Sequence, residues 1–470
     1  MEVTLSKRTL IKEISKKVGE EVFVYGWVHA RRDMGKIIFI DLRDATGLLQ
    51  VVCIPNQEAM FKIANSLRSE FVVAIRGKVN ARPEKNINQN IVSGTVELEA
   101  LEMQVLNESK TPPFEIDKNT MPVNEETRLK YRYLDLRSER MFKNMKLRYE
   151  VNRFMRNFLH QEGFTEIETP FLTKGTPEGA REFIVPSRLH PGKFYVLPQS
   201  PQQFKQLCMV AGLEKYFQIA RCLRDEDQRG DRQPEFTQCD IEMSFVKRED
   251  ILDLIERMMC ALIKEVTPEK KITQTPFPVF TYAESMEKYG SDKPDLRKDK
   301  NDPNELAFCW IVDFPMFETL DDGSVQAMHH PFCSVKEEDK EKLASGNDMM
   351  SIRANAYDLA CNGYEIWGGS IRIHEREVQN RIFELLKIDP ETIQKKFGHM
   401  LEAFEFGAPP HGGIASGQDR VIMVLANEPN IREVIAFPKT GDARCPLMNA
   451  PSELPEKSLK EANIRVLPQG

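Results

Sequence analysis

The sequence has none of the features of a membrane protein or of a disulfide-stabilised one. Its nine cysteines are scattered and form no Cys-x-x-Cys pair. This excludes a zinc ribbon and a disulfide framework and favours a reducing compartment. No stretch approaches the roughly 18 consecutive apolar residues of a membrane-spanning helix, and the first residues, MEVTLSKRTL, contain no apolar leader core. We therefore expect a cytoplasmic protein with no membrane partner.

Glycine-rich nucleotide motifs and an overall positive charge are also absent. Neither GxGxxG nor GxxxxGK followed by Ser or Thr occurs, so Rossmann and P-loop nucleotide binding are unsupported. The net charge of −7 argues against a nucleic-acid partner. The charge is uneven, however, because residues 1–110 carry 16 basic and 14 acidic side chains and the rest carry 49 and 58. A polyanion contact is therefore expected near the N-terminus, although chance would also explain a difference of this size.

The composition is that of a globular protein, with 41% hydrophobic and 29% charged residues in a chain of 470, a length typical of about three domains. Five short runs rich in Val, Ile and Phe predict strands, and the helical spacing of residues 58–68 predicts a helix after the third. This order is typical of an OB-type barrel, which binds single-stranded nucleic acid, although other small barrels have similar strings. The strand runs are 22–29, 37–42, 48–54, 71–79 and 91–101.

A proline-bearing connector, 111–128, follows the barrel and predicts a segment of limited flexibility without packed elements. Residues Ser138 to Gln161 then read as one long amphipathic helix that Gly163 ends. After the helix, β-like runs recur with little βαβ alternation, which predicts a mostly antiparallel α+β domain.

The charge-rich stretch RCLRDEDQRGDRQPEFTQCDIEMS, residues 221–244, predicts a strand–loop–strand unit with binding side chains. A solvated hairpin would show a similar charge run. The flanks are apolar, however, and the order Arg224, Glu226, Gln233, Phe236, Asp240 is specific. An arginine fork suits an α-phosphate, a phenylalanine can stack on a purine, and a carboxylate can accept from an exocyclic amine.

Two further segments carry charged residues beside glycines. In GYEIWGGSIRIH, residues 363–374, Glu365 and Arg372 are an odd number of residues apart, and a bulge at Gly368-Gly369 would bring both to one face. A glycine-kinked strand with surface charges is the alternative. In HGGIASGQDRVIMVL, residues 411–425, Arg420 opens an apolar helix whose N-terminus favours an anion. A glycine-rich turn before a core helix is the plainer interpretation. LPQSPQQFKQLCM, residues 197–209, would by itself pass for a capped amphipathic helix.

Taken together, these segments and GFTEIETPFL resemble the class II aminoacyl-tRNA synthetases. TPEGAREFIVPS, KYRYLDLR, AMHHPF and IREVIAFPK favour the bacterial-type aspartyl-tRNA synthetases over their lysyl and asparaginyl relatives, and the resemblance runs from about residue 20 to the C-terminus. It implies an α+β fold with an OB-type anticodon-binding barrel (1–107), a hinge (108–137) and a class II catalytic domain on a mostly antiparallel sheet flanked by helices (138–470).

The resemblance also implies an aspartate–tRNA ligase that makes aspartyl-adenylate from aspartate and ATP with Mg²⁺ and then transfers aspartate to the 3′ end of its tRNA. Arg224 and Arg420 would be catalytic, and a homodimer would form with Pro170 at its interface. Residues implied in ATP binding are Arg224, Asp225, Glu226, Gln233, Phe236, His330, Glu365, Gly417, Gln418, Asp419 and Arg420. Residues implied in aspartate binding are Glu178, Ser200, Gln202, Lys205, Arg224, Asp240, His329 and Arg372. Residues implied in metal binding are Asp358 and Glu365, and those implied in tRNA binding are Arg32, Phe39, Gln50 and Arg82.

The sequence departs from the family pattern at two places. The bacterial-type insertion of roughly a hundred residues, a domain by itself, is replaced by a short linker near 298–305, and ASGQDR has Ser416 and Gln418 where the family more often shows apolar residues. A ligase that also charges the asparagine tRNA, decided by barrel residues that include Met34 and Asn80, stays open. So does a non-catalytic tRNA-binding paralogue.

Overall fold

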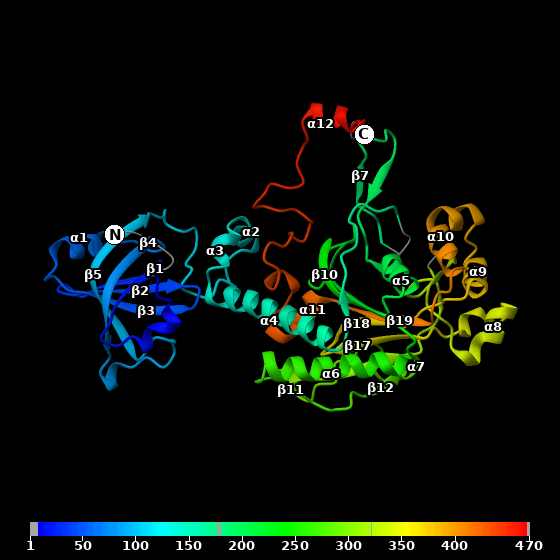
Figure 1. Cartoon of the computed structure of the whole chain (residues 1–470), viewed down its shortest axis with the longest axis horizontal. Coiled ribbons are helices and arrows are strands. Elements are labelled where there is room, and N and C mark those ends of the chain that lie inside the picture. Colours follow the sequence, from blue (N-terminus) through cyan, green and yellow to red (C-terminus); the bar gives the residue numbers. More distant parts are fainter. Residues whose placement is uncertain (1–7, 176–179, 321, 468–470) are drawn as a thin grey trace. The chain divides into compact units, whose positions relative to one another are not determined.

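The computed structural model describes residues 8–175, 180–320 and 322–467. Contacts within the chain divide it into two units, one formed by residues 1–124 and 133–139 and the other by residues 125–132 and 140–470 (Figure 1). The first unit is a small barrel, and the second is a large sheet covered by helices. None of the described helices is long and apolar enough to cross a membrane.

The first unit is built around a closed five-stranded barrel, as the sequence predicts. Alternate residues of each strand are buried in its core, for example Ile38, Ile40 and Leu42, because successive side chains of a strand point to opposite faces. The strands pair in the order β1-β2-β3-β5-β4. They are β1 (Glu21–Asp33), β2 (Ile38–Asp44), β3 (Gly47–Cys53), β4 (Val72–Ala81) and β5 (Val96–Asn107), with helix α1 (Glu58–Ser66) after β3 and short 3₁₀ helices at Ile11–Lys16 and Glu84–Asn86.

Two short helices, α2 (Glu125–Lys130) and α3 (Arg132–Asp135), follow the prolines of the expected connector. The end of this segment is packed, which differs from the expectation. Arg128 is buried and donates to both carboxylate oxygens of Glu433, at 2.9 and 3.0 Å. A bidentate pair of this kind fixes both side chains, so this part of the connector belongs to the second unit.

The second unit contains an eight-stranded sheet in the order β12-β14-β17-β18-β19-β10-β9-β6. Its two edge pairs, β6 with β9 and β12 with β14, are parallel and the inner pairs are antiparallel, which confirms the mostly antiparallel prediction. The strands are β6 (Thr165–Glu166), β9 (Lys215–Leu223), β10 (Glu235–Ser244), β12 (Val279–Thr281), β14 (Phe308–Val312), β17 (Ala356–Cys361), β18 (Tyr364–Ile371) and β19 (His411–Ser416).

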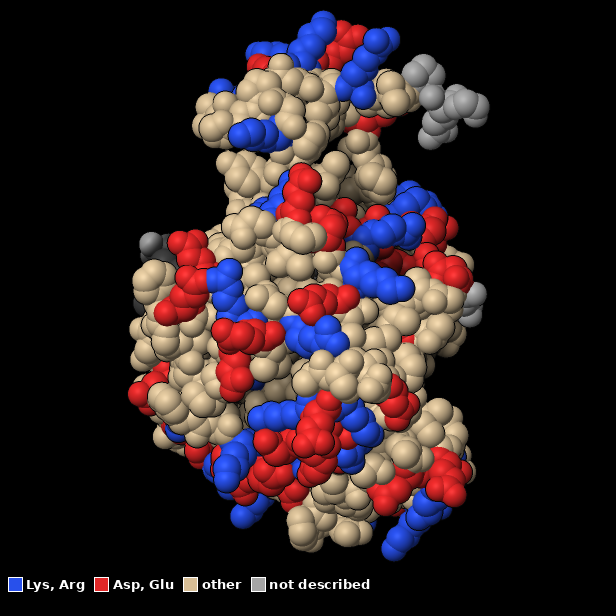
Figure 2. All heavy atoms as spheres, turned by 90° about the vertical axis from the view of Figure 1, so that its right-hand side faces the viewer, with Lys and Arg blue, Asp and Glu red and all other residues tan. Residues whose placement is uncertain are grey.

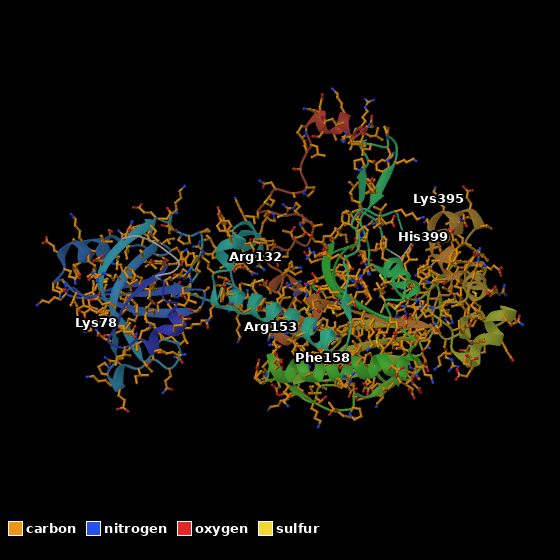
Figure 3. The ribbon with its side chains drawn as sticks, in the orientation of Figure 1. Lys78, Arg132, Arg153, Phe158, Lys395 and His399 are labelled. Carbon is orange, nitrogen blue, oxygen red and sulfur yellow. The ribbon has the colours of Figure 1, made fainter. Side chains whose placement is uncertain are left out.

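Strand β10 shows how the sheet separates its core from its functional face. Its odd-numbered residues Cys239, Ile241 and Met243 belong to the main hydrophobic core. Three helices contribute to the same core, namely α4 (Glu139–Gln161), α6 (Arg248–Val266) and α11 (Gln418–Ala426). Arg153 and Phe158 mark α4 in Figure 3. The even-numbered residues of β10 point to the other face, where the cavity described below lies.

The remaining elements surround this sheet or cover its edges. The short strands are β7 (Ile184–Pro186), β8 (Phe194–Val196), β11 (Lys271–Ile272), β13 (Glu305–Leu306), β15 (Phe317–Thr319) and β16 (Val325–Ala327). The helices are α5 (Gln202–Val210), α7 (Tyr282–Tyr289), α8 (Lys340–Ser345), α9 (Arg376–Leu385), α10 (Pro390–Phe404) and α12 (Glu456–Glu461), with 3₁₀ helices at Glu337–Asp339, Met349–Ser351 and Ile431–Glu433.

A short turn leads into β13 where the sequence predicts a replaced insertion. The backbone N–H groups of Lys298 and Asp299 both donate to the carboxylate of Glu305, each at 2.9 Å. The Lys270 ammonium donates to the carbonyl of Pro303 at 2.6 Å, and β13 pairs with β11. The turn is therefore closed by its own hydrogen bonds.

Candidate active site

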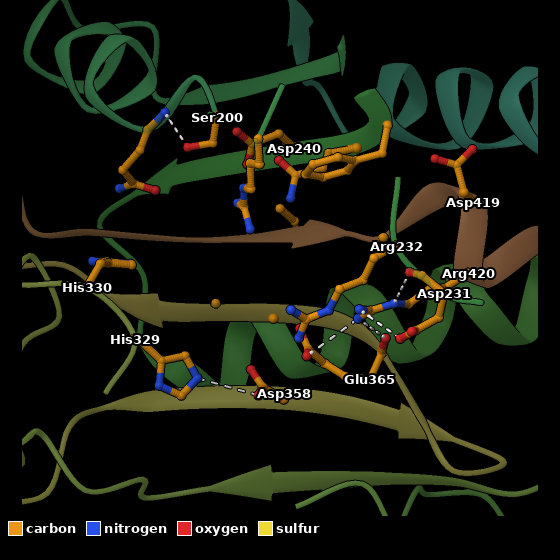
Figure 4. Close-up of a pocket in the computed structure, with 18 of the residues that line it drawn as sticks. Ser200, Asp231, Arg232, Asp240, His329, His330, Asp358, Glu365, Asp419 and Arg420 are labelled. Carbon is orange, nitrogen blue, oxygen red and sulfur yellow. Dashed lines mark hydrogen bonds and ion pairs between the residues drawn. The ribbon is translucent and has the colours of Figure 1, made fainter. Parts of the chain in front are cut away.

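A cavity of about 360 Å³ opens on the functional face of the sheet (Figure 4). It is lined from strands β10, β17, β18 and β19, from the segments that follow β9 and β16, and from the first turns of α5 and α11. Most of the site residues expected from the sequence meet here. They are Ser200, Gln202, Lys205, Arg224, Glu226, Gln233, Phe236, Asp240, His329, His330, Asp358, Glu365, Arg372, Gly417, Asp419 and Arg420.

Three of the residues expected to bind ATP or aspartate are not among those that line the cavity. Glu178 lies outside the described residues. The main chain of Asp225 is paired with that of Arg181, whose carbonyl accepts the Asp225 N–H at 3.0 Å. Gln418 is fully buried behind the cavity wall.

One end of the cavity is formed by a buried charge cluster of Lys205, Asp240, Glu242 and Arg372, all at most 2% exposed. The Lys205 ammonium lies 2.5 Å from Asp240 Oδ1 and 3.1 Å from Glu242 Oε2. Arg372 donates from Nε to Glu242 Oε1 at 3.0 Å and from NH1 to Ser370 Oγ at 2.7 Å. Two basic side chains thus face two carboxyl groups within the cluster.

The protonation of this cluster follows from burial and from its neighbours. Burial raises the pKa of Asp240 despite the Lys205 ammonium beside it. Burial also acts to raise the pKa of Glu242, but the Arg372 and Lys205 cations outweigh it and lower the pKa to about 2. Burial and then Arg372 lower the pKa of His330 well below its ordinary value. His330 is therefore neutral, and its Nε2 accepts from Arg372 NH1 at 2.8 Å, because a guanidinium only donates.

Glycine makes room for this cluster. A Cβ at Gly413 of β19 would lie 1.9 Å from Glu242 Oε2 and 2.3 Å from the backbone carbonyl of Ile241. Neither contact is compatible with a side chain, and the backbone atom cannot move aside. Gly413 therefore allows β10 to carry a buried carboxylate at Glu242.

At the other end of the cavity lies an arginine group of Arg224, Arg232 and Arg420. Arg224 follows β9, and its guanidinium lies 5.1 Å from the ring centroid of Phe236. Arg420 NH2 lies 3.1 Å from Asp231 Oδ2, and Arg232 NH1 lies 3.7 Å from Glu226. These pairs are partly exposed, with the Arg232 side chain 46% accessible. The arginine group therefore remains in contact with solvent.

A bulge in β18 brings Glu365 to the same face as Arg372. The pairing shifts between Leu359 and Ala360, whose partners are Trp367 and Glu365, so Ile366 is the additional residue. The predicted bulge exists, but it precedes Gly368 instead of falling on it. At Gly368 a Cβ would lie 2.8 Å from Asp358 Oδ1 and 3.2 Å from Glu365 Oε1, so this glycine leaves space for both carboxylates.

Asp358 and Glu365 form a carboxylate pair beside His329. Burial and then the Asp358 charge raise the pKa of Glu365. His329 Nε2 lies 3.5 Å from Asp358 Oδ2. Burial acts to lower the His329 pKa, but Asp358 and then Glu365 outweigh it and raise the pKa above 6.5. Within the described chain, Asp358 Oδ1 is buried without a hydrogen-bond partner, as expected for an atom that binds a cation.

Sequence reasoning missed Asp231 and Arg232, which line the cavity, and Glu242 of the buried charge cluster. Glu242 stands two positions after Asp240 on β10, and strand alternation by itself would have placed it on the same face. Asp231 and Arg232 lie in the charge-rich loop, where no periodicity distinguishes a ligand-facing side chain from a solvated one. On the face drawn in Figure 2, acidic and basic side chains are intermixed.

The expected nucleic-acid residues of the barrel lie on its outer side. Phe39 is half-buried between the core residues Ile38 and Ile40, and its cross-strand partner is Arg32. Arg32 NH2 donates to Asp41 at 3.0 Å, and the cross-strand partner of Asp41 is Gln50. Phe39 is therefore an outward residue and not part of the barrel core.

Glu97 of β5 links the other two expected barrel residues. Gln50 Nε2 donates to it at 3.1 Å, and Arg82 Nε lies 3.8 Å from it. Arg82 is largely buried, and its Nε and NH2 have no hydrogen-bond partner within the described part of the chain. These two nitrogens are therefore buried donors that no described acceptor satisfies.

Comparison with known proteins agrees with this division. A family model described as "tRNA synthetases class II (D, K and N)" matches residues 124–441, and one described as "OB-fold nucleic acid binding domain" matches residues 22–106. The aspartate–tRNA(Asp/Asn) ligase of Rubrobacter xylanophilus is 42% identical over 96% of this chain and 95% of that protein. The aspartate–tRNA ligase of Lysinibacillus sphaericus is 41% identical over 96% of this chain and 97% of that protein.

Solved structures show the same fold at lower identity. The asparaginyl-tRNA synthetase of Pyrococcus horikoshii, complexed with asparaginyl-adenylate, is 22% identical with a TM-score of 0.73, over 91% of this chain and 96% of that one. The aspartyl-tRNA synthetase of Entamoeba histolytica is 22% identical with a TM-score of 0.72, over 93% and 94% of the two chains.

Proposed function

Because the chain belongs to the class II tRNA synthetases of the D, K and N group, we propose that its cavity carries out aspartate activation and transfer. The protein is an aspartate–tRNA ligase: it joins aspartate to ATP with release of pyrophosphate and then transfers aspartate to tRNA. The observation that carries the assignment is the buried charge cluster, in which Arg372 and Lys205 are held facing the cavity by Glu242 and Asp240.

The buried charge cluster is proposed to select the substrate side chain. Arg372 and Lys205 retain donors for a carboxylate, and the side-chain amide of asparagine would turn an NH₂ group toward one of these cations. Because the two cations are already balanced by two carboxylates, their positions are fixed before aspartate arrives. Ser200 and Gln202, at the start of α5 in the same cavity, are proposed to bind the amino-acid backbone together with Glu178.

The arginine group is proposed to bind ATP. Phe236 offers a face for the adenine, and Gln233, Glu226 and Gly417 line the same part of the cavity. The reaction brings the aspartate carboxylate against the α-phosphorus, so two anions must approach each other. Arg224 and Arg420 offset this repulsion and stabilise the charge that develops. No protein nucleophile is needed, because positioning and electrostatics suffice.

Mg²⁺ fits the carboxylate pair. Hard cations prefer oxygen ligands, and Mg²⁺ is commonly held by one or two carboxylates together with phosphate oxygens and water. Asp358 Oδ1 lacks a hydrogen-bond partner within the described chain, and Glu365 has a pKa raised by burial and by Asp358. No described group of three His, Cys, Asp or Glu residues is arranged to hold a metal alone. When bound, the ion would neutralise phosphate charge.

The barrel is proposed to read the anticodon, with Phe39 stacking on a base and Arg32, Gln50 and Arg82 contacting base edges or phosphates. Aromatic stacking typically contributes about 1–3 kcal/mol per base. We also propose a homodimer with Pro170 at its interface and a reducing compartment, the cytoplasm, which the nine free thiols support. The replaced insertion is supported by an alignment of 574 positions against a chain of 470 residues.

Charging of the asparagine tRNA is a further part of the proposal. Relatives such as those of Rubrobacter xylanophilus and Symbiobacterium thermophilum are named aspartate–tRNA(Asp/Asn) ligases, and each is 42% identical to this chain. Asn80, one of the barrel residues proposed to decide the matter, donates to Glu99 at 3.0 Å, whereas Met34 is exposed. A non-catalytic paralogue is not favoured, because Lys205, Arg224, Arg372 and Arg420 all line the cavity.

Two assays with purified protein test the function. Aspartate-dependent exchange of pyrophosphate into ATP is expected in the presence of Mg²⁺, with no exchange on asparagine. Charging of purified aspartate and asparagine tRNAs then distinguishes a ligase that charges only the aspartate tRNA from one that charges both. Absence of exchange would remove the catalytic assignment, and absence of product on the asparagine tRNA would remove dual charging only.

A further inference from the structure

Behind the cavity wall, the side chains of Ser416, Gln418 and Asn152 are joined in one series of hydrogen bonds. The backbone N–H of Cys239 donates to Ser416 Oγ at 3.0 Å, and Ser416 Oγ donates to Gln418 Oε1 at 2.9 Å. Gln418 Nε2 then donates to Asn152 Oδ1 at 2.8 Å. We refer to these contacts as the Ser416–Gln418–Asn152 relay.

The direction of the relay is fixed by the chemistry of its members. A backbone N–H can only donate, so the hydroxyl of Ser416 accepts from it and directs its own hydrogen to Gln418. The amide oxygen of Gln418 can only accept, so its NH₂ group must find another partner. Ser416 and Gln418 are fully buried, and the half-buried Asn152 on α4 supplies that final acceptor. Losing it would leave a buried donor without an adequate partner, which is costly.

The relay runs directly behind the residues that line the cavity. Cys239, Ser416 and Gln418 each lie between two lining neighbours. Cys239 lies between Gln238 and Asp240. Ser416 lies between Ala415 and Gly417, and Gln418 lies between Gly417 and Asp419, with Arg420 next in the chain. The relay therefore fixes the relative positions of β10, β19 and the first turn of α11.

Helix α4 holds the first turn of α11 at a second point, one helical turn from Asn152. Arg148 NH1 lies 2.5 Å from Asp419 Oδ1, and the other oxygen of Asp419 accepts the Thr237 N–H at 3.0 Å. Residues four apart share one face of a helix, so Arg148 and Asn152 act side by side. The two unusual residues of this segment, Ser416 and Gln418, thus have a matching partner in Asn152.

We propose that Asn152 is a positioning residue for the nucleotide, acting through Gln418 to hold Gly417 and Arg420 against the cavity. The inference rests on the proposed binding of ATP at the arginine group. Without the Asn152 oxygen, the remaining acceptor that Gln418 Nε2 reaches among the described residues is the sulfur of Met155 at 3.4 Å, and a thioether is a weak acceptor. Gln418 would then turn away from Ser416, and the start of α11 would shift relative to β10.

The test compares Asn152→Leu with Asn152→Asp and with Asn157→Leu. Asn157 is an exposed residue of the same helix with no relay contact, so its replacement is a matched control. In pyrophosphate exchange at 25 °C, Asn152→Leu should raise the KM for ATP about 3–10-fold and leave the KM for aspartate within about twofold. Asn152→Asp keeps an acceptor oxygen and should restore the KM for ATP, and Asn157→Leu should match the wild type.

An unchanged KM for ATP in Asn152→Leu would overturn the proposal, as would an equal rise in both KM values or an Asn152→Asp variant that behaves like Asn152→Leu. Asn152→Ala carries the same expectation if the leucine variant does not fold. Calorimetric titration of each variant with ATP gives the same comparison without turnover. A wild-type protein that binds ATP but shows no exchange would contradict the proposed function and still allow this test.

Discussion

The two ends of the cavity differ in how deeply their charged side chains are buried and in how closely these are paired. In the buried charge cluster, Lys205 and Arg372 are each 2% exposed and paired with carboxylates within about 3 Å. In the arginine group, the ion pairs of Arg420 and Arg232 are 3.1–3.7 Å long and partly open to solvent. Charges shielded from water interact strongly and move little, whereas exposed pairs are weak and readily exchanged.

This difference matches what each end is proposed to bind. A small side-chain carboxylate must be distinguished from an amide, which requires cations in fixed positions. A flexible triphosphate must enter, react and leave as pyrophosphate, which requires cations that can exchange partners. Arg420 is paired with Asp231, and we propose that a phosphate replaces this partner.

The largest effect is expected from removing one arginine at each end. Arg372→Leu leaves Glu242 buried with only Lys205, a change that typically costs about 3–5 kcal/mol of stability, and it should abolish exchange. Arg420→Met breaks partly exposed pairs worth about 0–1 kcal/mol, yet it should reduce exchange about 10²–10³-fold. Thermal unfolding and exchange assays on both variants check the contrast. Equal loss of stability in the two would contradict it.

A smaller effect should follow from adding one methyl group at each end. In Gly413→Ala the new Cβ would meet Glu242 and a backbone carbonyl, so we expect a loss of about 1–3 kcal/mol. In Gly230→Ala, within the loop that carries Asp231 and Arg232, the nearest atom is 3.8 Å away, and stability should be unchanged. Urea unfolding measures both free energies, and a well-tolerated Gly413→Ala would show that β19 can move.

The smallest expected effect is a difference in pH dependence. The pKa of His329 is raised above 6.5, so protonated His329 stabilises the folded protein at low pH, and this contribution is lost as the pH rises through the raised pKa. The pKa of Glu242 is lowered from 4.5 to about 2, so its contribution is complete above 4.5 and is lost as the pH falls toward 2. The contributions of His329 and Glu242 therefore change in different pH ranges.

NMR titration of the histidine ring protons tests this directly. His329 should titrate above 6.5, and Asp358→Asn should lower its pKa, because the carboxylate that favours the imidazolium is removed. In His329→Gln, the melting temperature should vary less with pH near neutrality, whereas its decrease at acid pH should be the same as in the wild type. A His329 pKa at or below 6.5 would show that burial outweighs the carboxylates.

Much of the site was predictable because its residues occur in ordered, recognisable segments. The barrel, the long helix α4 and the antiparallel sheet follow from local patterns, and Arg224, Phe236, Asp240 and Arg420 meet as expected. Glu242 was missed although alternation along β10 indicated it. A carboxylate is normally excluded from such a position, and the glycine that makes room for it, Gly413, belongs to a strand far along the sequence.

Other features could not be predicted from local patterns. The position of the β18 bulge depends on its pairing with β17, which the sequence of β18 alone does not contain. The first turn of α11 could direct Gln418 into the cavity or away from it, and its hydrogen-bond partner Asn152 lies more than two hundred residues earlier in the chain. The packing of Arg128 with Glu433 is a similar long-range contact.

The turn before β13 has a consequence for protein engineering. Its two ends are joined by hydrogen bonds from Lys298 and Asp299 to Glu305, and they rest beside β11 at the border of the catalytic unit. Exposed turns whose ends lie close together accept whole folded modules whose own termini are adjacent. A fluorescent reporter or a ligand-responsive switch domain could be inserted at Asn301 with both of its termini joined to the enzyme. The sheet that supports the cavity and its charged groups would be left unchanged.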